Sequence, residues 1–232
     1  MDLLAFAHRG GSDGGFAPNS LDAFADARRR GCQIETDLRL SGDGQVVCAH
    51  DPFWFAGPHP IWIAHMSAAS LSRRGVPTLR RLYEELGTDF EVSADLKSRD
   101  AAAPAIAVAR DVGALGRLWL VSADLDLLAE IRTSEAEVRL MHETRHRDLA
   151  AEGIDARDHL SRLAAAHIDA ANTTVGDWTP ALVVHAQQLG LRAFGSLLQN
   201  PTAMSKAIAL GLDGFYSDHL DLMLTAIGRA ER

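Results

Sequence analysis

The segment QIETDL, residues 33–38, has the pattern of a short strand that carries two acidic side chains. Glu35 and Asp37 are two positions apart, so on an extended strand both carboxylates project from the same face. The segments AHRGG at 7–11 and VVCAHD at 46–51 flank it and add two histidines and an arginine. Two carboxylates on one face, bracketed by these groups, indicate a site for a divalent metal and a phosphate.

The residues before this segment predict the first repeating unit of an α/β fold. Residues 3–7 form a short apolar run, which is typical of a buried parallel strand. A glycine-rich loop at 9–15 follows. Asn19 is expected to cap a helix that ends at Gly31. With the strand at 33–38, the order is strand, helix, strand.

The next part of the chain predicts a hairpin and then an insertion. An Asp-Gly turn at 43–44 precedes a strand at 46–50 that is expected to pair back. Residues 52–76 keep no clear period, and we expect them to form a small insertion over the barrel mouth. Its aromatic run FWF at 53–55 fits two interpretations. The rings either line a pocket or pack the insertion onto the barrel.

Strands and helices then alternate to the end of the chain. Strands are predicted to begin at residues 3, 33, 90, 117, 138, 167, 192 and 214. Helices are predicted at 79–86, 101–112, 125–132, 180–189, 202–210 and 220–227, with broken helical material at 148–166. Eight such units predict a TIM (β/α)8 barrel, with residues 1–232 as one domain and the insertion after strand two. An open dinucleotide-binding sheet is disfavoured because the loop at 9–15 lacks the G-x-G-x-x-G pattern.

Composition narrows the classes of function. The net charge of −8 argues against sequence-independent nucleic-acid binding, which needs a basic surface. No stretch reaches the roughly 18 apolar residues that span a bilayer, so we expect a cytoplasmic protein without stable membrane association. Cys32 and Cys48 are too few for a disulfide framework and are expected to be reduced. The oligomeric state is left open.

Charged side chains recur where the first three parallel strands end, and in such a barrel these ends form the functional rim. The candidate residues are His8, Arg9, Glu35, Asp37, His50, Asp95 and Lys97. Carboxylates suit a hard cation such as Mg²⁺ or Ca²⁺, and an arginine can grip phosphate oxygens. Two histidines on different segments can divide the roles of proton acceptor and donor. This combination favours cleavage of a phosphodiester.

These residues resemble the glycerophosphodiester phosphodiesterase family, whose motifs appear in order along almost the whole chain. The matching segments are HRG at 8–10, APNS at 17–20, AF at 23–24, ETD at 35–37, DG at 43–44, HD at 50–51, PTL at 77–79, DLK at 95–97 and GLDGFYSD at 211–218. The resemblance implies a TIM barrel with an insertion after strand two. It also implies the residue roles: His8 and His50 as acid and base, Glu35, Asp37 and Asp95 as metal ligands, and Arg9 and Lys97 as phosphate ligands.

The resemblance further implies the reaction, which is cleavage of glycerophosphodiesters to glycerol 3-phosphate and an alcohol. The usual proposal for the family is attack by the substrate's own glycerol hydroxyl, followed by opening of a cyclic phosphate. Two other readings stay open: lysophospholipase D-like cleavage, with an apolar slot at 53–55, and a non-catalytic barrel that binds a phosphorylated ligand.

The sequence departs from the family pattern at three places. The glutamate of the family's Pro-Glu-Asn-Thr is missing before Asn19. Asp95 stands where the family has glutamate, which shortens the reach to a metal by one methylene. The segment SLLQ at 196–199 stands where the family has Trp-Thr-Val-Asn, so an aromatic wall of the substrate pocket is lost.

Overall fold

The computed structural model describes residues 3–56 and 59–230 and contains a closed parallel barrel. The strands lie in the order β1-β11-β10-β9-β8-β7-β6-β2, and β2 pairs with β1 to close the ring. The TIM-barrel prediction is therefore confirmed. The barrel strands are β1 Leu4–Ala7, β2 Gln33–Leu40, β6 Val92–Leu96, β7 Leu118–Ser122, β8 Arg139–Glu143, β9 Ala170–Thr174, β10 Arg192–Ser196 and β11 Gly214–Ser217.

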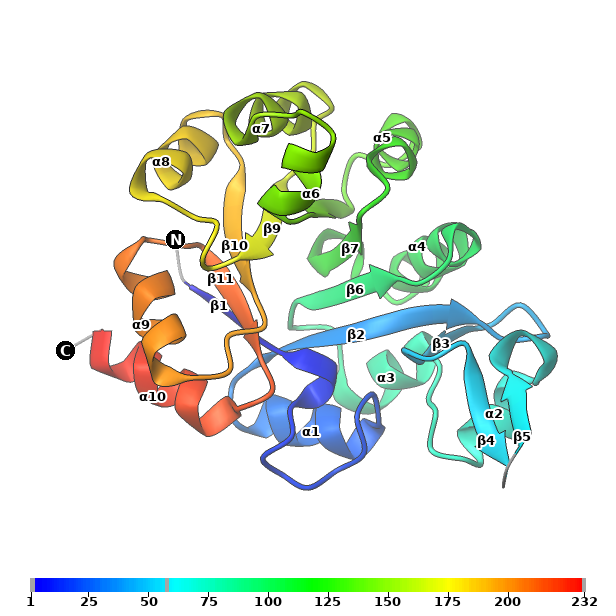
Figure 1. Cartoon of the computed structure of the whole chain (residues 1–232). Helices are drawn as coiled ribbons and strands as arrows, with labels where there is room; N and C mark the ends of the chain where they lie inside the picture. The colour runs from blue at the N-terminus through cyan, green and yellow to red at the C-terminus, as the bar shows by residue number, and fades with distance from the viewer. Residues whose placement is uncertain (1–2, 57–58, 231–232) are drawn as a thin grey trace.

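Helices surround the strands on the outside of the barrel (Figure 1). They are α1 Leu21–Arg29, α3 Leu79–Leu86, α4 Ala102–Asp111, α5 Leu125–Ser134, α6 His146–Ala151, α7 Ala156–Ala165, α8 Pro180–Gln188, α9 Pro201–Ala209 and α10 Leu220–Ala230. Their apolar faces and the outer faces of the strands bury one large hydrophobic cluster. Among the described residues, no helix is long and apolar enough to cross a membrane.

The predicted strand starts agree with the structure to within two residues at seven of the eight strands. The predicted start of the sixth strand was wrong, since the strand was expected to begin at residue 167 and Ala170–Thr174 is observed. The backbone of His167 is left-handed, with φ at 54°, and its N–H donates to the carbonyl of Ala164. The end of α7 therefore uses the residues that were assigned to the strand.

The predicted cap of α1 was also wrong. Ser20 caps the helix, and its side chain accepts a hydrogen bond from the Ala23 backbone N–H. Asn19 instead lies buried with φ at 58°, and its side chain contacts strand β2. Because asparagine tolerates the left-handed region better than most residues do, it can hold this inward turn.

The insertion has more regular structure than its sequence suggested. Strand β3, Val46–Cys48, pairs antiparallel with β2 as predicted. Strands β4, Phe53–Ala56, and β5, His59–Trp62, then form a separate hairpin, and η2, Ile63–His65, and α2, Ala68–Ser72, complete the insertion. Figure 1 shows this hairpin on the far side of the molecule from α9 and α10. Residues 57 and 58 of the predicted insertion lie outside the described residues.

The inside of the barrel is filled by aromatic and other large apolar side chains, so it is a packed core. The buried residues of this interior cluster are Phe6, Trp119, Val121, Met141, Ala170, Phe194 and Tyr216. Charged side chains lie below this interior cluster, at the amino ends of the strands. Arg139 and Arg192 lie over the Trp119 ring at 5.1 and 5.5 Å, and Glu91 accepts hydrogen bonds from Trp119 Nε1 and Arg139. Open space at the barrel axis is therefore found at the carboxyl ends of the strands.

Candidate active site

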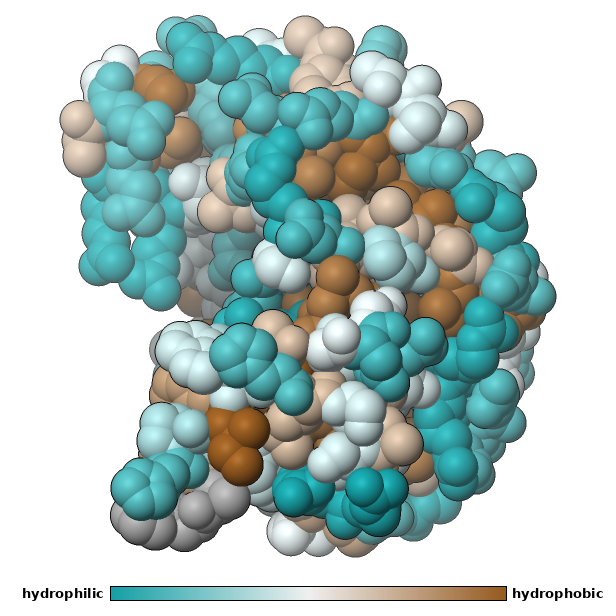
Figure 2. All heavy atoms as spheres, turned by 90° about the vertical axis from the view of Figure 1, so that its right-hand side faces the viewer, coloured by the Kyte–Doolittle hydropathy of each residue, from teal (hydrophilic) through white to brown (hydrophobic). Residues whose placement is uncertain are grey.

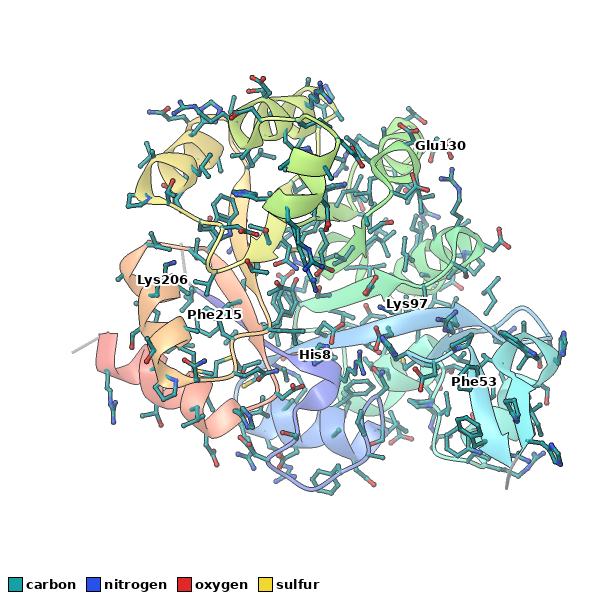
Figure 3. The ribbon with its side chains drawn as sticks, viewed as in Figure 1. His8, Phe53, Lys97, Glu130, Lys206 and Phe215 are labelled. Atoms are coloured by element: carbon teal, nitrogen blue, oxygen red, sulfur yellow. The ribbon has the colours of Figure 1, made fainter. Side chains whose placement is uncertain are left out.

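The chain turns sharply where β1 ends, and this turn presents the first two functional side chains. His8, Arg9 and Gly10 form the short helix η1 directly after Ala7. Arg9 has φ at 52°, and Gly10 has φ at 88°. A Cβ on Gly10 would lie 2.6 Å from the Ala23 Cβ, so only glycine allows this close approach to α1. The turn holds His8 over the barrel axis (Figure 3).

His8 is held by a carboxylate from the last strand. Its Nδ1 lies 2.7 Å from Asp218 Oδ1, and Asp218 in turn hydrogen-bonds Gln199. Its Nε2 lies 4.0 Å from Glu35 Oε2. Burial opposes protonation of His8, but the hydrogen bond to Asp218 and the charge of Glu35 outweigh it, so the pKa of His8 is raised. The ring is thereby oriented and favoured in its protonated form.

The two carboxylates of β2 lie in different electrostatic surroundings. Glu35 accepts a hydrogen bond of 2.7 Å from the Arg9 backbone N–H, and burial raises its pKa to about 8. Asp37 is also buried, which by itself raises its pKa. The hydrogen bond from Asn19 and the charges of Lys97 and Arg9 outweigh that burial, and the pKa of Asp37 is lowered.

Lys97 neutralises two of the predicted metal ligands. Its Nζ lies 2.5 Å from Asp95 Oδ2 and 3.0 Å from Asp37 Oδ1. The two aspartates are adjacent because they are register partners in the β2–β6 pair. Over residues 3–56 and 59–230, no three His, Cys, Asp or Glu side chains already converge on one point as a metal-binding group. In this conformation the ammonium group of Lys97 supplies the positive charge between these aspartates.

His50 reaches the site from the segment after β3. Its Nδ1 lies 2.8 Å from Asp51 Oδ1, and its backbone carbonyl accepts a hydrogen bond from Arg39. The side chain is 41% exposed, which is more than that of His8 at 17%. The two histidines therefore differ in their access to solvent and in the carboxylate that orients them.

All seven residues singled out from the sequence line one cavity of about 300 Å³. They are His8, Arg9, Glu35, Asp37, His50, Asp95 and Lys97. Figure 3 shows His8 and Lys97 near the barrel centre, while Glu130 on α5 and Lys206 on α9 lie on outer helices. The fold thus brings the candidates together, and their individual roles remain predictions.

A second cavity of about 410 Å³ adjoins the first and shares Arg9 and His50 with it. Phe53 and Trp54 line this second cavity, while Phe55 is 60% exposed. Trp54 also packs against the buried apolar cluster beneath the insertion. Both interpretations of the aromatic run therefore hold in part. Figure 2 shows a notch at the left edge of the molecule, above the lobe that carries the insertion.

Sequence reasoning missed several residues of the site. Asp218 was part of a recognised motif at the end of the last strand, and the rule that strand ends carry function could have found it. Glu143 and Asn172 line the cavity from β8 and β9. Burial, and then the negative charge of Asp95, raise the pKa of Glu143. Glu143 is the last residue of β8 and Asn172 lies within β9, and neither was among the residues singled out from the sequence.

Comparison with known proteins agrees with this architecture. Residues 8–56 match the model of the glycerophosphoryl diester phosphodiesterase family. A curated relative from Mycobacterium tuberculosis, named as a probable glycerophosphodiester phosphodiesterase 2, is 31% identical over 127 residues, covering 51% of this chain and 48% of the relative. The match thus spans about half the length of that relative.

Solved structures extend the likeness to the whole barrel. A putative glycerophosphoryl diester phosphodiesterase from Silicibacter pomeroyi has a TM-score of 0.83 at 21% identity, covering 99% of this chain and 94% of that one. A phosphodiesterase from Oleispira antarctica, solved in complex with the product sn-glycerol-3-phosphate, has a TM-score of 0.80 at 19% identity, covering 97% and 96%. At these identities the structures show a shared fold.

The protein is a TIM barrel with its candidate site at the carboxyl ends of the strands. Within that class, the family model over residues 8–56 and the curated relative over about half of the chain show similarity to the glycerophosphodiester phosphodiesterase family.

Proposed function

We propose that this protein hydrolyses glycerophosphodiesters to glycerol 3-phosphate and an alcohol, with a divalent metal as cofactor. The observation that carries the proposal is the single cavity that collects two histidines, three carboxylates, an arginine and a lysine from four segments. A barrel that only bound a phosphorylated ligand would need the cations but no acid and base pair.

The donor chemistry at this site fits a hard cation. Glu35, Asp37 and Asp95 offer only oxygen ligands, which Mg²⁺ and Ca²⁺ prefer. Glu35 is buried, and among the described residues no side-chain nitrogen of a lysine or arginine lies within 4.0 Å of its carboxylate. Its raised pKa reflects chiefly this burial. Glu35, Asp37 and Asp95 would hold the metal, which would stabilise negative charge that develops on the phosphate.

Two cations of the chain can hold the phosphate group. Arg9 lies 3.0 Å from Asp37 through Nε, but at an angle that makes no hydrogen bond, and the side chain lines both cavities. Lys97 points into the barrel cavity from the end of β6. Displacement of its ammonium from Asp37 and Asp95 would free both carboxylates for the metal and the lysine for the phosphate.

The two histidines suit opposite roles in proton transfer. His8 is held by Asp218 and has a raised pKa, so it can donate a proton to the leaving alcohol. His50 lies where the two cavities meet and is more exposed, so it can accept the proton of the attacking hydroxyl. General acid–base catalysis of this kind typically contributes about 10²–10⁴-fold to a rate.

Release of glycerol 3-phosphate from a panel of glycerophosphodiesters tests the proposal, with Mg²⁺, with Ca²⁺ and with chelator. We expect turnover with metal, loss of turnover with chelator, and loss of turnover in His8→Ala and His50→Ala. Circular dichroism should report an unchanged fold for both variants. Full activity of either variant would refute its assigned role, and no release with any metal would refute the activity.

Lysophospholipase D-like cleavage is a second candidate, favoured by the aromatic face of the β4–β5 hairpin. Phe53 contacts both Phe55 and Trp62 edge to face, and the latter two are 60% and 52% exposed. Such a surface beside the cavity could accommodate an acyl chain. Higher kcat/KM for a lysophospholipid than for its deacylated counterpart would support this candidate, and the reverse order would exclude it as the main activity.

A further inference from the structure

The barrel cavity has a second wall, which the proposed chemistry does not use. Strands β8, β9 and β10 supply it through Glu143, Asn172 and Ser196. Glu143 and Asn172 are register partners, so their side chains lie next to each other on the same face of the sheet. Ser196 pairs with Thr174, two residues beyond Asn172 on β9. The three polar side chains therefore form a contiguous patch across the barrel from β2.

The unpaired amide oxygen of Asn172 indicates that a ligand binds at this wall. Its side chain is only 4% exposed, and its Oδ1 has no hydrogen-bond partner among the described residues. Leaving such a buried acceptor unpaired costs about 1–3 kcal/mol, and buried amides in native proteins are nearly always satisfied. Because this amide lines the cavity, a hydroxyl group of a bound molecule can satisfy it.

The neighbouring groups select the kind of ligand. No hydrogen bond or ion pair within residues 3–56 and 59–230 engages the Glu143 carboxylate, so it is available to accept hydrogen bonds from hydroxyls. A quaternary ammonium such as that of choline has no N–H or O–H to donate to the Asn172 amide oxygen, whereas a hydroxyl group has one. The Ser196 side chain is small and leaves the wall open. A carboxylate, an amide and a hydroxyl together match an alcohol that carries several hydroxyl groups.

The position of His8 indicates which arm of the substrate reaches this wall. His8 lines the barrel cavity and not the cavity beneath the insertion, whereas His50 lines both. If His8 protonates the leaving alcohol, that alcohol departs inside the barrel cavity. Its remaining hydroxyls then lie within the space bounded by Glu143, Asn172 and Ser196.

We propose that Glu143, Asn172 and Ser196 form the subsite for the leaving alcohol and select a polyol, so that preferred substrates are diesters of glycerol phosphate with glycerol or inositol. This inference rests on the proposed function and specifies its substrate class. Sites built to hydrogen-bond a substrate hydroxyl discriminate strongly against analogues that lack it, because the site's own polar groups are then left unpaired.

The test compares kcat/KM for glycerophosphoglycerol and glycerophosphoinositol with kcat/KM for glycerophosphocholine. We expect the wild-type enzyme to favour the two polyol diesters by about tenfold or more, which is the scale of one or two hydrogen bonds. Asn172→Leu should lower kcat/KM for the polyol diesters about tenfold and change that for the choline diester less than about threefold. Ser196→Trp should fill the subsite and act in the same direction.

Thr144→Val is the matched control, since Thr144 lies next to Glu143 on the chain but does not line the cavity. It should leave the substrate preference unchanged. Thermal denaturation of Asn172→Leu should give a Tm equal to or above that of the wild type, because the lost oxygen has no partner. A fall in Tm of several degrees would overturn the claim that the amide is unsatisfied.

The outcomes separate this inference from the proposed function. An equal loss of kcat/KM for all three diesters in Asn172→Leu would place the shared glycerol arm at this wall. That result would overturn the inference but not the proposed function. Equal kcat/KM for all diesters in the wild type would do the same. Failure of the wild-type enzyme to release glycerol 3-phosphate from any diester would overturn both.

Discussion

Asp218 acts on the candidate site through His8 and does not line the cavity itself. Its carboxylate fixes the Nδ1–H tautomer of the ring and favours the protonated form, as carboxylates beside catalytic histidines do. The pair joins the first and last strands of the barrel, which lie side by side. Asp218 is therefore a positioning residue in our proposal.

At the residue scale, Asp218→Asn should lower kcat by about 10–10³-fold without unfolding the protein, because a protonated His8 loses its counter-charge. Removing the carboxylate should also lower the pKa of His8. The alkaline limb of the pH profile, where the proton donor is lost, should therefore move to lower pH. Asp221→Asn, at an exposed residue paired with Arg30, is the control and should leave the profile unchanged. An unshifted alkaline limb in Asp218→Asn would contradict this role.

Metal binding should raise the thermal stability of the protein, and this effect can be measured without an activity assay. A ligand that binds the native state at 100 times its Kd stabilises it by about 2.7 kcal/mol. We expect Mg²⁺ or Ca²⁺ to raise the Tm of the wild type, and Glu35→Gln to abolish most of that rise. Glu152→Gln, at an exposed position on the surface, should retain it. If metal raised the Tm of both variants equally, Glu35 would be excluded as a metal ligand.

At the scale of elements, two histidines join β8 to α7. His142 Nδ1 lies 3.3 Å from His159 Nε2, and His142 Nε2 lies 3.1 Å from the Ala123 carbonyl oxygen. Both side chains are buried. Burial, and then the neighbouring His142, lower the pKa of His159 to about 4. The pair is therefore packed as two neutral rings.

This packing predicts a loss of stability in acid. The unfolded chain takes up the His159 proton near pH 6.5 and the folded chain only near pH 4, so the unfolded state binds more protons between these values. The contribution of His159 to stability is present above about pH 6.5 and is lost as the pH falls. Between pH 7 and pH 5 the loss should be about 2 kcal/mol.

Denaturant unfolding of the wild type and of His159→Gln at pH 7 and pH 5 measures this contribution. The variant keeps an amide that can donate to His142 but cannot titrate, so its stability should fall less with acid. His65→Gln, at an exposed residue of the insertion, should behave like the wild type. Parallel pH dependences in the wild type and His159→Gln would rule out the pair as the source.

At the scale of the whole molecule, the charged cluster around Trp119 and the candidate site lie at opposite ends of the barrel. Glu91 accepts from Trp119 Nε1 at 2.7 Å and from Arg139 at 3.1 Å, at the amino ends of the strands. Glu91→Leu leaves both donors without this partner. We expect it to lower the free energy of unfolding by about 1–3 kcal/mol, with kcat within about twofold of the wild type. A large loss of kcat at full stability would refute this separation.

The sequence was sufficient to predict the barrel and the seven candidate residues that line its cavity. Those residues lie within short motifs, and strand ends of a parallel barrel meet at one rim whatever the detailed register is. Glu143 and Asn172 could not be predicted from the sequence as neighbours in the site, because their adjacency depends on the register of β8 and β9. The β4–β5 hairpin was missed because its strands lack the alternation of a half-buried sheet.

The contact between His8 and Asp218 spans 210 positions of the chain. A polypeptide still emerging from the ribosome would hold His8, Arg9, Glu35 and His50 long before it held the strand that supplies the partner carboxylate. If Asp218 positions His8 as we propose, such a nascent or truncated chain would be inactive. Closure of the barrel and orientation of the His8 side chain both require β11 and the residue that follows it. Activity would then appear only with a completed barrel, so a cell would be spared hydrolysis by unfinished chains.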